Sequence, residues 1–565
     1  MPTIDIDYLE FEKLLGLELH KSVEKVNEIL EFVKGEVKLF DEKANVMSVE
    51  IKDTNRPDLW NVEGLTRALR GFLGLETSPR QYKIGKPLID VYVDERLENI
   101  RPYIGCSTIK NVNLTDAIIR GFMHMQDKLD QSYGKDRQRT SIGLYNFDLI
   151  KPPLSYSVAK PNEVSFVPLG FDEKMSLKEI LKSHPKGMEY GHIVKGHSVY
   201  PILLDAENKV LSFPPIINSN DLGKITEKTK NVLIEVTGTM HEAVLNTLKI
   251  VTLSLVDRGG KAYSATVHYS KEKQAVVTPS FEAKSMDLTV EYANKVLGLR
   301  LTAKQIAGLF PKAGFNIEKA FHDKVTVQIP CYRLDVMHPV DLVEDIAIAY
   351  GYNRIQPLWR EMPTTGYVQP KQGLMDVARE LMIGLGFQEV LTYTLTSPEN
   401  LFAKMNCKKE RTVEIANPKV QTLTCLRSWL LPSLMAFLSY NTSVEYPQRI
   451  FELGKVTLHD AKSETKTRDD EHLAAVVCHA NASFTEIKSA LDALFMNLGL
   501  KWQIERTKHS SFMEGRVGVA IVEKTNVGIL GEVYPKVLEA WKLENPVAAF
   551  ELNIDKIFKI LQTRQ

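Results

Sequence analysis

A chain of 565 residues is too long for one hydrophobic core, because domains usually contain about 100–200 residues. Its apolar fraction of 44% and charged fraction of 25% are typical of globular proteins in water. The 71 basic residues balance the 71 acidic ones, which excludes an overall positive field, so a nucleic-acid partner would need a local basic patch or a more basic second subunit. No apolar run reaches the ~20 residues that cross a bilayer, and no signal-peptide pattern opens the chain, which predicts a cytoplasmic protein.

The cysteines argue against a disulfide framework or a zinc ribbon, because their number is odd and no two of them form a C-x-x-C pair. We expect them to be small buried apolar residues. They are Cys106, Cys331, Cys407, Cys425 and Cys478.

Turn-forming residues divide the chain into four predicted parts: 1–90, 91–275, 276–358 and 359–565. In the first part, apolar residues at helical spacing predict a helix over 23–33 and another after the turn at 55–58. The second part mixes β-branched strands at 90–93 and 232–236 with a predicted helix at 117–129.

The third part is predicted to be a small helix-turn-helix-like module. We expect a helix over 287–297, a second helix opened by the capping box at Thr302 and Gln305, a strand over 325–329, and a third helix after Pro339.

The fourth part opens with an amphipathic helix over 374–385 and carries another helix at 484–498. Many strands with few helices between them predict an antiparallel α+β domain. The expected strands are 389–394, 412–415, 449–456, 473–478, 517–522 and 547–552.

Four acidic residues form the most specific local pattern. Asp341, Glu344 and Asp345 follow at i, i+3 and i+4, so their carboxylates share one face of a helix, and Asp335 precedes them in a loop. Four oxygen donors without His or Cys suit Mg²⁺ rather than zinc. The alternative is that acids at a helix N-terminus only oppose the helix dipole.

The run from Tyr332-Arg333-Leu-Asp335 through Asp341-Leu-Val-Glu344-Asp345 to Tyr350-Gly351-Tyr352 resembles the B5 domain of phenylalanyl-tRNA synthetase β subunits. The resemblance implies that Asp335, Asp341, Glu344 and Asp345 ligate a magnesium ion near the α subunit. The last position is Asp where many relatives have Glu.

Other stretches resemble the same family in the same order, so the resemblance covers nearly the whole chain. It is closest to the archaeal type. The implied fold is multidomain α+β, with a mixed α/β editing domain, the B5 domain and a non-catalytic class II synthetase-like antiparallel core. The matching stretches are Thr54–Leu59, the segment from Tyr103 to about His268, Asn417-Pro418, Leu426–Ser428 and Ile450–Gly454.

The synthetase-like core lacks the arginines that class II aminoacylation needs to hold ATP phosphates. Its last strand, 548–553, has neither the alternating glycines nor the terminal arginine of the family's third motif. Arg427 and Arg449 remain, and we expect them to pack internally or to contact the α subunit. No residue is therefore assigned to aminoacylation or to a cofactor other than Mg²⁺.

The candidate active region is the segment 201–239. In archaeal-type relatives this region forms a pocket that hydrolyses tyrosine wrongly attached to tRNA(Phe), and the matching positions are Leu203, Ser212, Glu235 and Thr237. The family has Asp at the position of Glu235, so this side chain is one methylene longer. The alternative is that Ser212 and Thr237 only end strands and that Glu235 is a solvated edge charge.

Lys174-Met-Ser176-Leu-Lys178 resembles the mobile-loop signature of class I synthetases, but that chemistry also needs a His-x-Gly-His sequence, which is absent. We expect Ser176 to cap a surface helix instead. The spacing of His184, His192 and His197 predicts no ligand role.

Three hypotheses remain open. The chain is the β subunit of a heteromeric ligase that charges tRNA(Phe) through its α subunit and edits tyrosyl-tRNA(Phe); or a free-standing aminoacyl-tRNA deacylase; or a structural tRNA-binding subunit with a vestigial pocket. The family resemblance implies two α and two β chains and no membrane partner.

Overall fold

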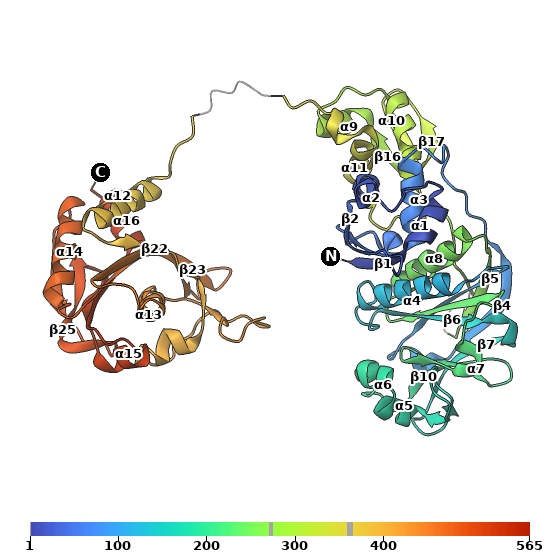
Figure 1. The fold of residues 1–565 in the computed structure, drawn as a ribbon, viewed down its shortest axis with the longest axis horizontal. Coiled ribbons are helices and arrows are strands. Elements are labelled where there is room, and N and C mark those ends of the chain that lie inside the picture. The colour runs from blue at the N-terminus through green and yellow to red at the C-terminus, as the bar shows by residue number, and fades with distance from the viewer. Residues whose placement is uncertain (1, 271–274, 359–364, 565) are drawn as a thin grey trace. The chain divides into compact units, whose positions relative to one another are not determined.

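The computed structural model describes residues 2–270, 275–358 and 365–564. It contains two compact units, residues 1–359 and residues 360–565. In each unit, helices pack on the faces of sheets (Figure 1), which confirms the prediction of a mixed α/β, multidomain chain. Every helix in the described ranges is too short or too polar to cross a membrane.

The first unit begins with a three-stranded sheet and three helices. The strands pair in the order β1-β3-β2 and comprise β1 (Thr3–Asp7), β2 (Gly35–Asp41) and β3 (Val46–Ile51). Each helix starts after a side chain that accepts a backbone N–H, which satisfies one of the free donors at a helix start. The helices and their caps are α1 (Tyr8–Leu15) after Asp7, α2 (Val23–Leu30) after Ser22, and α3 (Val62–Phe72) after Asn61.

A ten-stranded sheet follows, in the order β12-β11-β10-β7-β4-β14-β5-β13-β6 with β15 paired to β14. Only the β4–β14 and β4–β7 pairs are parallel. Strand β6 ends the path, so one of its edges carries no paired strand from the described residues. The strands are β4 (Gly85–Val93), β5 (Tyr103–Lys110), β6 (Thr140–Asn146), β7 (Leu154–Ala159), β10 (Tyr200–Leu204), β11 (Val210–Phe213), β12 (Ile217–Asn218), β13 (Val232–Gly238), β14 (Lys261–Tyr269) and β15 (Val276–Thr278).

Two long helices, α4 (Asp116–Gln131) and α8 (His241–Asp257), lie side by side on one face of this sheet (Figure 1). Their apolar residues belong to the same hydrophobic core as Phe11 and Leu65 of the first ninety residues. The parts predicted as 1–90 and 91–275 therefore share one core, and strand β4 runs through residue 90.

The smaller elements of this region are α5 (Leu177–Ser183), α6 (Pro185–Tyr190), α7 (Asn220–Gly223) and the strand pair β8 (Ser165–Phe166) and β9 (Met175–Ser176). Ser176 caps α5 in a reciprocal capping box with Glu179, which confirms the predicted role of this serine.

The third part contains a three-stranded sheet and three helices. Residues 287–289, predicted as helix, belong to strand β16; the helix starts only after Thr289, whose hydroxyl accepts the Tyr292 N–H. The capping box at Thr302 is present. The elements are β16 (Lys284–Thr289), β17 (Asn316–Ala320), β18 (Lys324–Ile329), α9 (Val290–Leu297), α10 (Ala303–Leu309) and α11 (Pro339–Tyr350).

The second unit is built on a seven-stranded sheet in the order β19-β22-β23-β27-β26-β25-β24, antiparallel except at β19–β22. The predicted strand 389–394 is reduced to β19 (Gln388–Glu389), and 412–415 supplies only one bridge, at Glu414. The other strands are β22 (Gln448–His459), β23 (Thr467–Cys478), β24 (Trp502–Arg506), β25 (Phe512–Val522), β26 (Thr525–Val533) and β27 (Val547–Asn553), with the separate pair β20 (Leu395–Thr396) and β21 (Cys425–Leu426).

Helices cover both faces of this sheet. One hydrophobic core lies under α12 (Pro370–Gly384), α14 (Phe484–Asn497) and α16 (Ile554–Gln562), and a second lies under α13 (Leu431–Tyr440) and α15 (Pro535–Ala540) (Figure 1). The central strand β27 is buried along its whole length, as expected for a strand with a core on each side.

Candidate functional site

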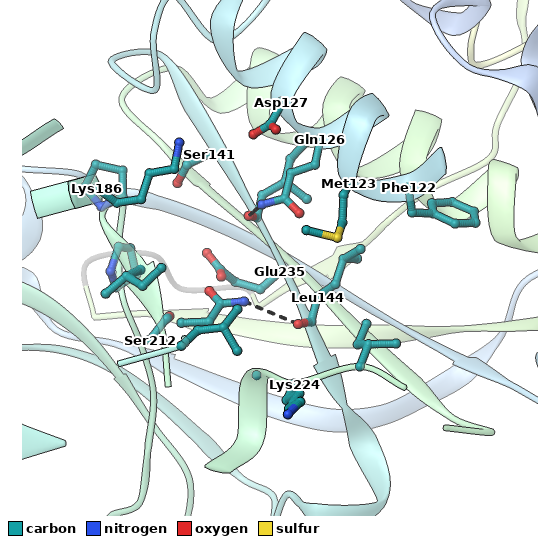
Figure 2. A pocket seen from close by; sticks show the side chains of 18 of the residues that line it. Phe122, Met123, Gln126, Asp127, Ser141, Leu144, Lys186, Ser212, Lys224 and Glu235 are labelled. Atoms are coloured by element: carbon teal, nitrogen blue, oxygen red, sulfur yellow. Dashed lines mark hydrogen bonds between the residues drawn. The ribbon is translucent and has the colours of Figure 1, made fainter. Parts of the chain in front are cut away.

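A cavity of about 390 Å³ lies at the free edge of strand β6. Helix α4 forms one wall, and residues 212–218 with 223–225 form the opposite one (Figure 2). Two side chains reach the edge carbonyls: the Gln126 amide donates to Ile142 O at 2.8 Å, and the Asn218 amide donates to Leu144 O at 3.3 Å. A cavity of this size with a few polar groups in apolar walls is typical of a small-ligand site.

Glu235, on β13, points into this pocket, and only 2% of its surface is exposed (Figure 2). Its Oε2 atom accepts a hydrogen bond of 2.7 Å from the Tyr145 hydroxyl, whereas Oε1 has no hydrogen-bond partner among the described residues. Burial raises the pKa of Glu235 to about 7, although the Tyr145 hydroxyl, the charge of Arg101 and the Thr237 hydroxyl lower it. Glu235 is therefore a buried carboxyl whose Oε1 atom forms no hydrogen bond of normal length and angle with a described residue, although the Thr237 hydroxyl lies near enough to lower its pKa. The solvated-edge alternative is wrong.

Gly143 makes the contact between Glu235 and Tyr145 possible. It lies opposite Glu235 in the β13–β6 register. A Cβ atom at this position would lie 2.3 Å from the Tyr145 hydroxyl oxygen and 2.5 Å from Glu235 Oε2. The two polar groups therefore meet directly above the backbone of Gly143, in space that any other residue would fill.

Arg101 is a buried cation beside the pocket, with 1% of its surface exposed. Its Nε donates to the Thr237 hydroxyl at 2.9 Å, and one terminal nitrogen donates to the Ser141 hydroxyl at 3.0 Å and to Thr237 O at 2.7 Å. The other terminal nitrogen donates to Arg137 O at 2.9 Å. No carboxylate of the described residues forms an ion pair with it, and burial lowers the pKa of the guanidinium.

Arg137 joins the walls of the pocket. Its guanidinium donates to Pro215 O at 3.1 Å and to Ile216 O at 3.0 Å, forms an ion pair with Asp130 at 3.0 Å, and stacks over the Tyr190 ring at 4.4 Å. Burial raises the pKa of Asp130 to about 7, despite this arginine. Arg137 thus ties the end of α4 to the segment 214–216 and to α6.

The structure separates the four residues predicted for this site. Ser212 and Glu235 line the pocket. Leu203 and Thr237 are fully buried and are not among its lining residues; Leu203 pairs with Ser212 across β10 and β11. Thr237 still contacts the site through the hydrogen bonds of its hydroxyl.

Sequence reasoning missed Ser141, Tyr145, Arg101 and Arg137, because these residues come from segments without a motif. The three histidines singled out earlier have no role in the pocket lining; His184 accepts the Lys186 N–H and caps α6.

The acidic cluster of the third part is held by arginine. Arg333 donates to both Asp335 oxygens, at 2.9 and 2.7 Å, and to Asp345 Oδ2 at 2.6 Å. Arg56 lies 3.6 Å from Asp335 Oδ1. Burial raises the pKa of Asp335, but Arg56 and Arg333 outweigh this effect and lower it to about 2. These two carboxylates therefore already have cationic partners within the chain.

The other two predicted ligands also have protein partners. Asp341 accepts the backbone N–H groups of Met337 and His338, at 2.8 and 2.7 Å, at the start of α11. Glu344 is half-exposed and pairs with Lys34 at 2.5 Å. Within the described ranges, no three His, Cys, Asp or Glu side chains are placed to hold a metal ion. All four carboxylates thus have partners within the chain, and magnesium binding by them stays a prediction.

Both arginines singled out in the second unit are paired with carboxylates. Arg427 is buried, and its guanidinium lies 2.7 Å from Glu452, which is fully buried. Arg449 lies 2.7 Å from Glu486. The first interaction is the internal packing predicted from the sequence, and it leaves Arg427 no free face for a phosphate.

Comparison of the sequence with known protein families identifies the family of this chain. Residues 286–352 match the model of the tRNA synthetase B5 domain, and residues 355–554 match that of the phenylalanyl tRNA synthetase beta chain CLM domain. The phenylalanine–tRNA ligase beta subunit of Pyrococcus furiosus is 41% identical over 561 residues, which cover 99% of this chain and 100% of that protein. The chain belongs to the phenylalanine–tRNA ligase beta subunit family. The beta subunit of Thermococcus onnurineus is 40% identical and covers 99% of each chain.

The solved structure of a relative resembles the first unit of this chain. An N-terminal fragment of the phenylalanyl-tRNA synthetase beta subunit from Pyrococcus horikoshii superposes with a TM-score of 0.60 at 37% identity, covering 62% of this chain and 100% of the fragment. The resemblance to the archaeal type is thus confirmed.

Proposed function

We propose that this chain acts with an α subunit in charging tRNA(Phe) and hydrolyses tyrosyl-tRNA(Phe) in the pocket at the edge of β6. The observation that supports editing is Glu235, a buried carboxyl whose Oε1 has no hydrogen-bond partner among the described residues. Tyrosine carries the hydroxyl that would satisfy this oxygen, and phenylalanine does not.

The magnitude of the preference follows from the cost of an unpaired buried acceptor. A phenylalanyl group would leave Glu235 Oε1 unsatisfied, at a cost of about 1–3 kcal/mol. The synthetic site, shaped for phenylalanine, rejects the added hydroxyl only imperfectly. A second site with a polar acceptor reverses that selection, and hydrolysis of an activated ester needs only a positioned water and hydrogen-bond donors.

The test is deacylation of preformed tyrosyl-tRNA(Phe) and phenylalanyl-tRNA(Phe) by the αβ complex. We expect much faster hydrolysis of the tyrosyl ester, and a narrower ratio for Glu235→Ala. An unchanged ratio removes Glu235 from the mechanism, and equal slow hydrolysis of both esters by the wild type favours a structural subunit with a vestigial pocket.

Aminoacylation itself is proposed to occur on the α subunit, in a complex of two α and two β chains. The pairing of Arg427 with Glu452 supports this proposal, because a class II site needs free arginines for the ATP phosphates. The class II-like core would then serve as an interface, which a free-standing deacylase does not need. Phenylalanine-dependent pyrophosphate exchange should be absent from the purified chain and present after addition of the α subunit.

Magnesium binding by Asp335, Asp341, Glu344 and Asp345 stays a prediction. Within the chain, Arg333 pairs with Asp335 and Asp345, and Lys34 pairs with Glu344.

A further inference from the structure

Ser141 lies where a hydroxyl of this pocket can meet the reacting ester. It lines the pocket from strand β6, directly opposite Thr237 in the β13–β6 register and two residues from Gly143 (Figure 2). Two residues along a strand span about 6.6 Å. The Glu235 carboxylate lies above Gly143, so Ser141 stands two residues along β6 from the proposed acceptor of the phenolic hydroxyl.

The hydrogen-bond pattern restricts the direction of the Ser141 hydroxyl proton. A guanidinium group can only donate, so the Ser141 oxygen accepts from Arg101 at 3.0 Å and the Thr237 oxygen accepts from the same side chain at 2.9 Å. The Ser141 proton must then point away from Arg101, either to the Thr237 oxygen at 3.2 Å or into the pocket.

The buried charge of Arg101 makes this hydroxyl a stronger donor. Arg101 forms no ion pair with a carboxylate of the described residues, and its remaining donors bind backbone carbonyls of Arg137 and Thr237. An unneutralised cation in a site of low dielectric polarises the hydroxyls that accept from it, and stabilises negative charge that develops beside them.

We propose that Ser141 donates a hydrogen bond to the oxyanion formed during hydrolysis of the tyrosyl ester, and that Arg101 is the positioning residue that directs and polarises it. This inference rests on the proposed editing function. Water attacks the ester carbonyl carbon, and the carbonyl oxygen becomes the oxyanion that accepts from Ser141. The bond to the ribose oxygen then breaks, and this oxygen takes one of the two water protons, which gives the free tRNA hydroxyl. The second water proton remains on the tyrosine carboxylic acid and is released to solvent as the carboxylate forms.

The experiment is single-turnover deacylation of tyrosyl-tRNA(Phe) by the αβ complex carrying Ser141→Ala. Removing one oxyanion donor lowers the rate constant about 100-fold. We expect this loss at saturating enzyme, with the enzyme concentration for half-maximal rate unchanged, and recovery of most of the rate in Ser141→Thr. Ser107→Ala is the matched control: this buried serine lies on β5 of the same sheet, and its hydroxyl donates to Tyr263 O at 3.3 Å, away from the pocket.

Arg101→Lys gives a second measurement, because a lysine cannot donate to both hydroxyls in the fixed fork geometry. A folded Arg101→Lys complex should show a lower rate constant without weaker binding.

Three results overturn the inference: an unchanged rate constant in Ser141→Ala, a loss confined to binding, or a loss of thermal stability with a normal rate. If the wild-type complex itself fails to hydrolyse tyrosyl-tRNA(Phe), the editing function fails instead. The two failures are therefore distinguishable.

Discussion

Replacing Gly143 with alanine tests the geometry of the proposed acceptor most directly. The new Cβ atom would lie 2.3 Å from the Tyr145 hydroxyl oxygen and 2.5 Å from Glu235 Oε2. Ordinary contacts are about 3.5 Å, so both side-chain ends must move by about 1 Å. That movement breaks the 2.7 Å hydrogen bond that fixes the Glu235 carboxyl.

The expected loss can be estimated from the hydrogen bond that disappears. A bond to a charged group contributes about 1.5–3 kcal/mol, which corresponds to roughly 10–150-fold in a rate ratio. The preference for tyrosyl-tRNA(Phe) over phenylalanyl-tRNA(Phe) should fall by a factor in this range. The protein should remain folded, because only the ends of two side chains are displaced and overpacking typically costs about 1–3 kcal/mol.

The assay compares initial deacylation rates of the two esters for the wild-type and Gly143→Ala complexes, with circular dichroism as the folding check. Gly105→Ala is the matched control: Gly105 lies on β5 of the same sheet, and an added Cβ would meet Leu248 of α8 rather than the pocket. A folded Gly143→Ala complex with unchanged selectivity would refute the role of the Glu235–Tyr145 pair.

Three further predictions concern charge. Burial raises the pKa of Glu235 from 4.5 to about 7, so the folded protein holds this proton more tightly than the unfolded chain. The free energy of unfolding of the wild type, relative to that of Glu235→Gln, should therefore fall as the pH rises from about 4.5 to about 7. Thermal melts across that pH range measure this difference. Arg427→Met should destabilise the second unit by about 3–5 kcal/mol by stranding buried Glu452, and adding Glu452→Gln should restore much of this loss in denaturant titrations. Because Arg333 pairs with Asp335 and Asp345 and Arg56 lies beside Asp335, removing divalent metal should leave the melting temperature of the isolated chain unchanged. A fall reversed by Mg²⁺ would support the magnesium prediction.

Local sequence patterns predicted the elements that depend only on residues close together in the sequence. The predicted helix cap at Ser176 and the predicted capping box at Thr302 both involve residues three positions apart, and both are present. The start of α9 was predicted too early, because residues 287–289 fit either a strand or a helix in isolation. Their strand state depends on pairing with β18, which supplies Lys324 as the partner of Asp287. Pairing with a distant strand therefore determined the secondary structure of residues 287–289, which the sequence pattern alone did not.

The candidate site could be predicted only in part for the same reason. Family resemblance pointed to Ser212 and Glu235, which both line the pocket. Arg101, by contrast, is 136 residues away from Thr237 in the sequence, and no spacing rule connects the two. The magnesium prediction used three acids on one helix face, Asp335 in the preceding loop and the family resemblance, and it could not anticipate that Arg333 binds two of these acids.

The distribution of buried charge argues against a vestigial pocket. Arg101 is buried without an ion pair to a described carboxylate, and Glu235 and Asp130 are carboxyls whose pKa burial raises to about 7. Each of these groups costs stability, and apolar residues of similar volume would pack the same space more favourably. A sheet edge with only a structural role has no need of such groups, whereas a site that must bind a phenolic hydroxyl and stabilise an oxyanion requires both an unsatisfied acceptor and a buried cation. The loss of stability caused by these buried charged groups beside one cavity thus favours an active editing site. The rate constants of the Ser141 and Gly143 variants measure whether these groups contribute to catalysis.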